Sequence, residues 1–174
     1  MSKVYLIGDL HFGHRYIHRF RNDWGPPPDR GPFADELDHR EYVIERWNAV
    51  IKKRDMVYVL GDAAFTQEGL VDIARLNGEK VLVAGNHDDL PAEDYLRYFR
   101  RVRGCLKYHG HWLTHIPMHP QELYRGRNIH GHCHTGGPDG PDYFNVCLEF
   151  IDYQPKLFTE IVEELDRRAE DEDG

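Results

Sequence analysis

The sequence lacks the features that mark membrane and secreted proteins. No apolar run approaches the roughly 18 residues that a membrane-spanning helix needs. Met1-Ser2-Lys3 leads directly into a strand-like segment, so we expect no signal peptide. Only 3 cysteines occur among 174 residues, and none is spaced as CxxC, so we expect no disulfide framework. These absences predict a protein of the reducing cytoplasm with no membrane partner.

Negative charge outnumbers positive charge. The 22 Lys and Arg residues against 30 Asp and Glu give a formal net charge of −8. Residues 160–174 are strongly acidic, so we expect one catalytic domain over 1–159 followed by an acidic helix or tail over 160–174. Such a charge balance does not favour nucleic acid as a partner. A basic cluster at residues 97–107 is either a solvated helix face or a contact for a phosphate-bearing substrate.

Short apolar runs that end in Asp, Asn or His are the most informative feature present. Runs of this kind are typical of buried parallel strands. In open α/β sheets, ligands bind beyond the carboxyl ends of such strands. We therefore expect the polar groups that follow the runs to form one site. They are Asp9, His11, Asp62, Asn86, His87, His115, His132 and His134.

Carboxylates, an amide and imidazoles together suit metals of intermediate hardness. Manganese, iron, cobalt, nickel and zinc all accept such ligands. The groups are too many for one ion but fit two ions that share one carboxylate. We therefore predict two divalent metal ions as cofactors, manganese first, with iron, zinc, nickel or cobalt as alternatives.

Strand-like and helical segments alternate along the chain. Strands are predicted at 3–7, 55–60, 80–84, 106–108, 112–114, 127–129, 143–150 and 155–158. Helices are predicted at 35–53, 67–76 and 92–101 and from about 160 onward. A loop is predicted at 22–32, including a Pro-rich stretch at 25–32. The alternation predicts an α/β fold with a partly parallel sheet. The last strands, without helices between them, predict a second and more antiparallel sheet.

The motifs, in this order, resemble those of the calcineurin-like metallophosphoesterase superfamily. The likeness extends to its small prokaryotic and phage phosphoesterases and covers roughly residues 1 to 158. Tyr16, where that subgroup tends to carry Asn, and the Pro-rich loop depart from the pattern and leave the substrate open. The blocks that carry the resemblance are Asp9-x-His11, Gly61-Asp62, Gly85-Asn86-His87-Asp88, His115 and Gly131-His132-x-His134, with Pro32-Phe33, Trp47-Asn48 and Asn145-Val146.

The resemblance implies a four-layer α-β-β-α sandwich of two mixed sheets flanked by helices. It implies that one metal takes Asp9, His11, Asp62 and His134. The other takes Asp62, Asn86, His115 and His132, so that Asp62 bridges the two ions.

The resemblance also implies catalytic and substrate-binding roles beside the metals. His87 resembles the general acid that protonates the leaving group. Asp88 either orients His87 or fixes the loop. Asn86 and His14 are expected to contact the substrate, although His14 could instead cap the turn after the first strand. Cys133 is expected to point away from the ligands, with a zinc thiolate as the alternative.

We therefore expect a metal-dependent hydrolase, and specifically a phosphodiesterase acting on small or nucleotide diesters. The chain lacks the Arg-bearing motif by which related protein phosphatases hold a phosphate dianion, which favours diesters. The alternatives are a phosphomonoesterase or a nuclease with the same metal site, or a non-enzymatic scaffold such as the retromer subunit of this fold. Nuclease relatives usually carry capping domains, for which 174 residues leave no room.

Overall fold

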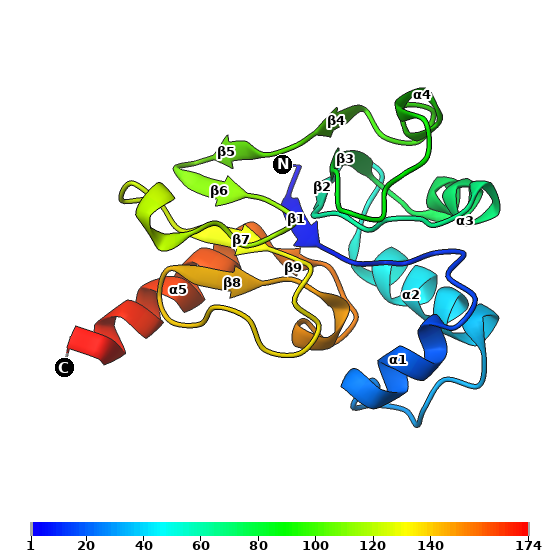
Figure 1. Cartoon of the computed structure of the whole chain (residues 1–174), viewed down its shortest axis with the longest axis horizontal. Coiled ribbons are helices and arrows are strands. Elements are labelled where there is room, and N and C mark those ends of the chain that lie inside the picture. The colour runs from blue at the N-terminus through cyan, green and yellow to red at the C-terminus, as the bar shows by residue number, and fades with distance from the viewer. Residues whose placement is uncertain (1, 174) are drawn as a thin grey trace.

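Two β-sheets form the middle of the molecule (Figure 1), and a computed structural model describes residues 2–173. The first sheet has the strand order β4-β3-β2-β1-β9, and the second has the order β5-β6-β7-β8. In Figure 1, helices α1 to α4 lie to the right of the sheets and α5 lies at the lower left. The predicted α/β fold, with two mixed sheets flanked by helices, is confirmed.

The first sheet is parallel apart from one edge. Its parallel strands are β1 (Val4–Ile7), β2 (Met56–Val59), β3 (Glu79–Val83) and β4 (Arg101–Arg103). The short strand β9 (Lys156–Leu157) pairs antiparallel with β1. The expectation that segment 155–158 belongs to the second sheet is therefore wrong.

The second sheet is more parallel than expected. It contains β5 (Leu106–Tyr108), β6 (His111–Leu113), β7 (Asn128–His130) and β8 (Tyr143–Asn145). Only β5 and β6 pair antiparallel, whereas β6–β7 and β7–β8 are parallel. Parallel neighbours need a connection of about a dozen residues. Here loops provide it in place of helices, which is why the sequence suggested antiparallel strands.

The helices differ from prediction mainly at their ends. Helix α2 (Glu36–Val50) is capped by Asp35, whose side chain accepts a hydrogen bond from the Asp38 N–H at 2.9 Å. Helix α3 (Gln67–Asp72) is capped by Thr66 and continues as a 3₁₀ turn, Ile73–Arg75. Further 3₁₀ turns lie at Pro120–Glu122 and Leu148–Phe150. The second turn replaces the end of the predicted strand 143–150, which in the structure stops at Asn145.

Two helices were poorly anticipated. Helix α1 (Ile17–Trp24) was not predicted, and its last residues fall in the predicted loop 22–32. Helix α4 (Ala92–Tyr95) is much shorter than the predicted 92–101, because the chain then extends to add β4 to the edge of the first sheet. Pairing with a neighbouring strand here overrides local helix preference.

Helix α5 (Phe158–Asp173) packs against the body of the molecule. Ile161 and Leu165 are fully buried, so the apolar face of the helix belongs to the core although most of its charges face outward. The division at residue 159 into a catalytic domain and an acidic tail stays a prediction. No helix among residues 2–173 combines the length and apolar character needed to cross a membrane.

Candidate metal centre

The loops that follow the strands hold the predicted ligands in strained backbone conformations. Asp9, His11, Asp62 and His132 have φ angles of 62°, 53°, 51° and 69°. Such angles are uncommon for residues other than glycine and cluster at functional sites. Hydrogen bonds between the loops maintain them: the Asp9 N–H donates to Gly61 O at 2.9 Å, and the His11 N–H donates to Asp62 O at 2.8 Å.

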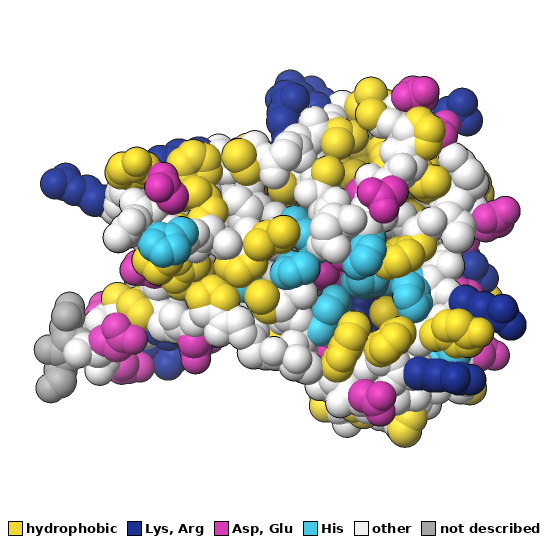
Figure 2. All heavy atoms as spheres, in the orientation of Figure 1, with side chains coloured by type: hydrophobic (Ala, Val, Ile, Leu, Met, Phe, Trp, Pro, Cys, Tyr) yellow, Lys and Arg dark blue, Asp and Glu magenta, His cyan; other side chains and the backbone are white. Residues whose placement is uncertain are grey.

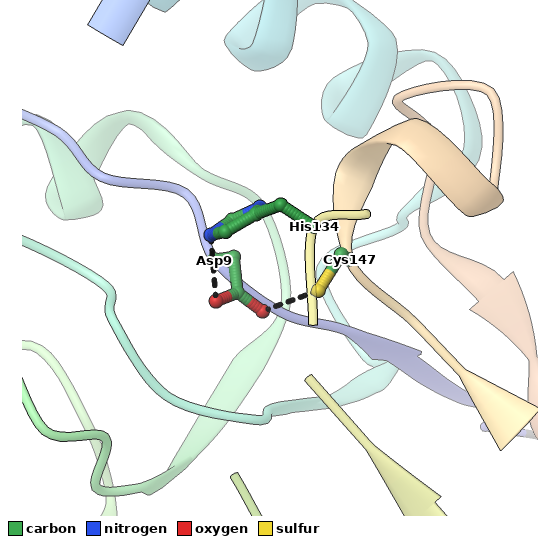
Figure 3. Close-up of side chains that lie close together, drawn as sticks. All are labelled: Asp9, His134 and Cys147. Carbon is green, nitrogen blue, oxygen red and sulfur yellow. Dashed lines mark hydrogen bonds and ion pairs between the residues drawn. The ribbon is translucent and has the colours of Figure 1, made fainter. Parts of the chain in front are cut away.

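Asp9, His11 and His134 form one half of the cluster. The Nε2 atoms of His11 and His134 lie 3.2 Å apart. Asp9 Oδ1 lies 3.7 Å from His11 Nε2 and 3.6 Å from His134 Nε2. Asp9 Oδ2 points away from them and accepts from the Cys147 thiol at 3.1 Å (Figure 3). Both oxygens of Asp9 also accept from the His132 backbone N–H, at 3.2 and 3.0 Å, and Oδ1 faces the imidazoles.

Asn86, His115 and His132 form the other half. His115 Nε2 lies 2.9 Å from Asn86 Oδ1 and 3.2 Å from His132 Nδ1. His115 Nδ1 lies 2.9 Å from Leu60 O, which can only accept, so the proton of this ring is on Nδ1. The lone pair of His115 Nε2 therefore points at a second acceptor, the Asn86 oxygen.

Asp62 lies between the two halves and is buried. Its Oδ2 is 3.7 Å from His11 Nε2, and its Oδ1 is 3.5 Å from His115 Nε2. Oδ1 also accepts from the His87 backbone N–H at 3.0 Å. The structure thus brings all seven predicted ligand side chains into one connected cluster.

The donor set fits divalent cations. Burial lowers the pKa of His11 to about 4, although the nearby Asp9 carboxylate acts in the opposite direction. Burial would raise the pKa of Asp9, but the adjacent His11, with His115 and His134, holds it well below its usual range. At neutral pH His11 therefore offers a lone pair and Asp9 a charged oxygen that face each other, an arrangement that a cation between them would stabilise.

A hollow of about 180 Å³ opens beside this cluster. Histidine side chains surround it on the face shown in Figure 2, with hydrophobic side chains at its rim. His87 is exposed there, and its ring stacks on Phe65 with the centroids 4.8 Å apart. His14 lines the same hollow, and its Nδ1 also accepts from the Tyr16 N–H at 3.3 Å. The two roles expected for His14 are therefore compatible.

Asp88 turns back toward the preceding loop. Its carboxylate accepts hydrogen bonds from the N–H groups of Asp62, Ala63 and Gly85, at 2.8, 2.9 and 2.8 Å. Burial raises its pKa, and the backbone donors act against that rise. These contacts match the loop-fixing alternative, in which Asp88 ties the loop after β2 to the loop after β3.

Sequence reasoning missed four residues around the cluster: Arg21, Trp24, Cys147 and Glu149. Trp24 stacks on His134, with the ring centroids 4.0 Å apart and the planes 12° apart. Burial and the charge of Asp9 raise the pKa of Cys147, so its thiol stays protonated and donates to Asp9. Cys147, next to the Asn145-Val146 pair, is the thiol close to the ligands, whereas Cys133 packs near Gly137.

Comparison with known proteins gives consistent matches along the chain. A family model for calcineurin-like phosphoesterases matches residues 2–171. An uncharacterized protein of Methanocaldococcus jannaschii is 30% identical, over 96% of this chain and 93% of that protein. The gene 66 protein of Mycobacterium phage D29 is 29% identical, over 78% of this chain and 80% of that protein.

A solved structure has the same fold. The crystal structure of a protein of unknown function from Aquifex aeolicus aligns with a TM-score of 0.69 and 23% identity. The alignment covers 94% of this chain and 100% of that one.

Proposed function

The chain belongs to the calcineurin-like phosphoesterase family, and we propose that it uses two divalent metal ions to hydrolyse phosphodiesters. Metal-dependent phosphoester hydrolysis follows from the family itself. The number of ions, the roles of individual residues and the preference for diesters are our proposal. The small or nucleotide diesters anticipated from the sequence are the substrates we favour.

The position of Asp62 carries the proposal of two ions. One carboxylate oxygen faces His11 and the other faces His115, at 3.7 and 3.5 Å from their Nε2 atoms. A carboxylate shared in this way supports two neighbouring cation sites. Asp9, His11 and His134 would complete one site, and Asn86, His115 and His132 would complete the other. Manganese is the ion we favour, and the mixture of carboxylate, amide and imidazole ligands also suits iron, cobalt, nickel and zinc.

Protein groups around the cluster support catalysis. Bound divalent cations supply Lewis acidity toward phosphoryl oxygens and lower the pKa of water toward neutrality. His87 projects from the loop after β3 into the hollow, where its ring can donate a proton to a leaving group. Its backbone N–H holds Asp62, so the position of His87 is tied to the cluster without its ring being a ligand. His14 and Asn86 would contact the substrate.

The surroundings of the cluster support a preference for diesters. A second hollow lies on the side of Asn86 and His115, so the cluster has open space on two sides. A diester carries a substituent on each side of its phosphorus. Among the described residues that line either hollow there is no Lys or Arg, the side chains that bind a phosphate dianion best. A monoanionic diester needs such a side chain less.

The decisive experiment compares two substrates after metal reconstitution. Metal-free protein is loaded with Mn²⁺, its metal content is measured, and kcat/KM is determined for bis-p-nitrophenyl phosphate and p-nitrophenyl phosphate. We expect two ions per chain and the higher kcat/KM for the diester. One tightly held ion with full activity refutes the dinuclear site. A monoester advantage of tenfold or more refutes the diester preference.

Two matched variants test the bridging role. Asp62 follows β2 and Asp55 precedes it, and both carboxylates are buried. Asp62→Asn should weaken both ions and reduce activity more than any other single change of a ligand. Asp55→Asn removes an acceptor of backbone N–H groups at the opposite end of the strand. It should lower stability and leave the metal content unchanged.

A further inference from the structure

A buried ion pair lies directly behind His134. Arg21 of α1 is fully buried, and the side chain of Glu149 is 4% exposed. The guanidinium donates to the Glu149 carboxylate through Nη1 and to the Asp9 backbone carbonyl through Nη2. The Arg21 guanidinium thus contacts the backbone of the predicted ligand Asp9 and the carboxylate that lies beside the predicted ligand His134. Being buried, Arg21 is not accessible to a substrate.

The pair meets His134 on the nitrogen that faces away from the other ligands. His134 Nδ1 lies 3.3 and 3.4 Å from the two Glu149 oxygens and 3.3 Å from Arg21 Nη1. These two neighbours favour opposite tautomers. A proton on Nδ1 can be donated to Glu149, whereas a lone pair there would accept from Arg21 and place the proton on Nε2.

The carboxylate is the stronger determinant of the tautomer. The Nη1 group of Arg21 is already engaged with Glu149, and a guanidinium has no acceptor to offer. The Glu149 carboxylate is paired with the buried Arg21 guanidinium, and both of its oxygens face Nδ1 of His134 as hydrogen-bond acceptors. With the proton on Nδ1, the lone pair of Nε2 faces Asp9 Oδ1 and His11 Nε2, where a cation would lie.

Trp24 packs against the face of the His134 imidazole. The indole stacks on the imidazole, and Phe20 stacks on the indole at 5.4 Å between centroids. His134 is therefore fixed in rotation by the stack and in tautomer by Glu149. Asn86, His115 and His132 have no such contact with the Arg21–Glu149 pair among the described hydrogen bonds.

We infer that Glu149, held in place by Arg21, is a positioning residue that prepares His134 to bind the first of the two ions. The inference rests on the proposed dinuclear site and adds an asymmetry to it. The pair supports the ion held by Asp9, His11 and His134, and leaves the ion held by Asn86, His115 and His132 unaffected.

The test is metal binding by variants of the full chain. Equilibrium dialysis against a series of free Mn²⁺ concentrations gives the occupancy of both sites. Glu149→Gln removes the charged acceptor. Because it also leaves a buried Arg unpaired, the neutral double variant Arg21→Met/Glu149→Gln serves as a second test. Glu164→Gln is the matched control, since Glu164 pairs with Arg168 at 2.7 Å on α5, a partly exposed pair outside the cluster.

We expect one Mn²⁺ to bind about 10–100-fold more weakly in both Glu149 variants, the range for lost outer partners of histidine ligands. The other ion should bind as in the wild type, and Glu164→Gln should not alter either. Wild-type affinity for both ions in the variants overturns the positioning role. Failure of both variants to fold also overturns it, because the pair would then be structural. A wild-type chain that binds fewer than two ions refutes the dinuclear site itself.

An independent measurement needs no variant. Nitrogen-15 chemical shifts of the imidazole distinguish the two neutral tautomers in the metal-free wild-type protein. We expect His134 to carry its proton on Nδ1. A proton on Nε2 would overturn the inference, because Glu149 would then not be the group that determines the tautomer.

Discussion

Replacing Gly85 with alanine tests the geometry of the candidate centre through a residue that carries no functional group. Gly85 follows β3, and its Cα faces the loop that holds Asp62. A Cβ at this position would lie 2.6 Å from Asp62 N and 3.0 Å from Asp62 Cγ, where ordinary contact begins at 3.4 Å. Asp62 or the Gly85 loop must therefore move by close to 1 Å.

Such a displacement is large for a bridging ligand. A misplacement of about 1 Å costs on the order of 10²-fold in rate when reacting groups must be held in register. We therefore expect Gly85→Ala to lower kcat/KM on bis-p-nitrophenyl phosphate about 10²-fold and to lower the Mn²⁺ content. Gly31→Ala is the matched control, since a Cβ there meets nothing within 4 Å and should leave both values unchanged. A fully active Gly85→Ala protein with two ions would refute the assignment of Asp62 as the bridge.

Two further predictions concern His87 and the cysteines. His87→Ala keeps the backbone N–H that holds Asp62, so it should retain its metals. It should lose about 10²–10⁴-fold on alkyl esters and less on p-nitrophenyl esters, whose leaving group barely needs a proton; equal losses on both would argue against the general acid. At pH 8 a thiol reagent should label exposed Cys105 and spare Cys147, whose pKa is raised by burial. Rapid labelling of Cys147 in the folded protein would contradict its buried contact with Asp9.

The fold and the ligand cluster could be predicted because their signals are local. Strands β1 and β2 and most of β3 are short apolar runs, and each predicted ligand follows a strand within a few residues. Parallel strands bring their carboxyl ends to one edge of the sheet, so the order of motifs in the sequence was enough to predict that they meet. Asp62 and His115 come from different sheets and still lie 3.5 Å apart.

The elements that were mispredicted depend on distant partners. Residues 101–103 became a strand because β3 offered an open edge, and residues 156–157 joined the first sheet because β1 offered the other. Helix α1 carries polar residues at most positions, and one of its two buried side chains is Arg21. A buried arginine does not appear in an apolar pattern, so periodicity could not indicate which face of this helix packs inward.

The supporting residues of the cluster were missed for the same physical reason. Arg21 and Glu149 are 128 positions apart, and neither residue type is unusual for an exposed position. Only the fold brings them together, and only their burial makes the pairing consequential, since a buried charge requires a partner. Asp88 shows the same effect on a shorter scale: its neighbour in the motif is His87, but its hydrogen bonds reach back to Asp62 and Ala63. The motifs therefore indicate where metal ions would bind, whereas the contacts that set ligand tautomer and loop position are determined by tertiary structure.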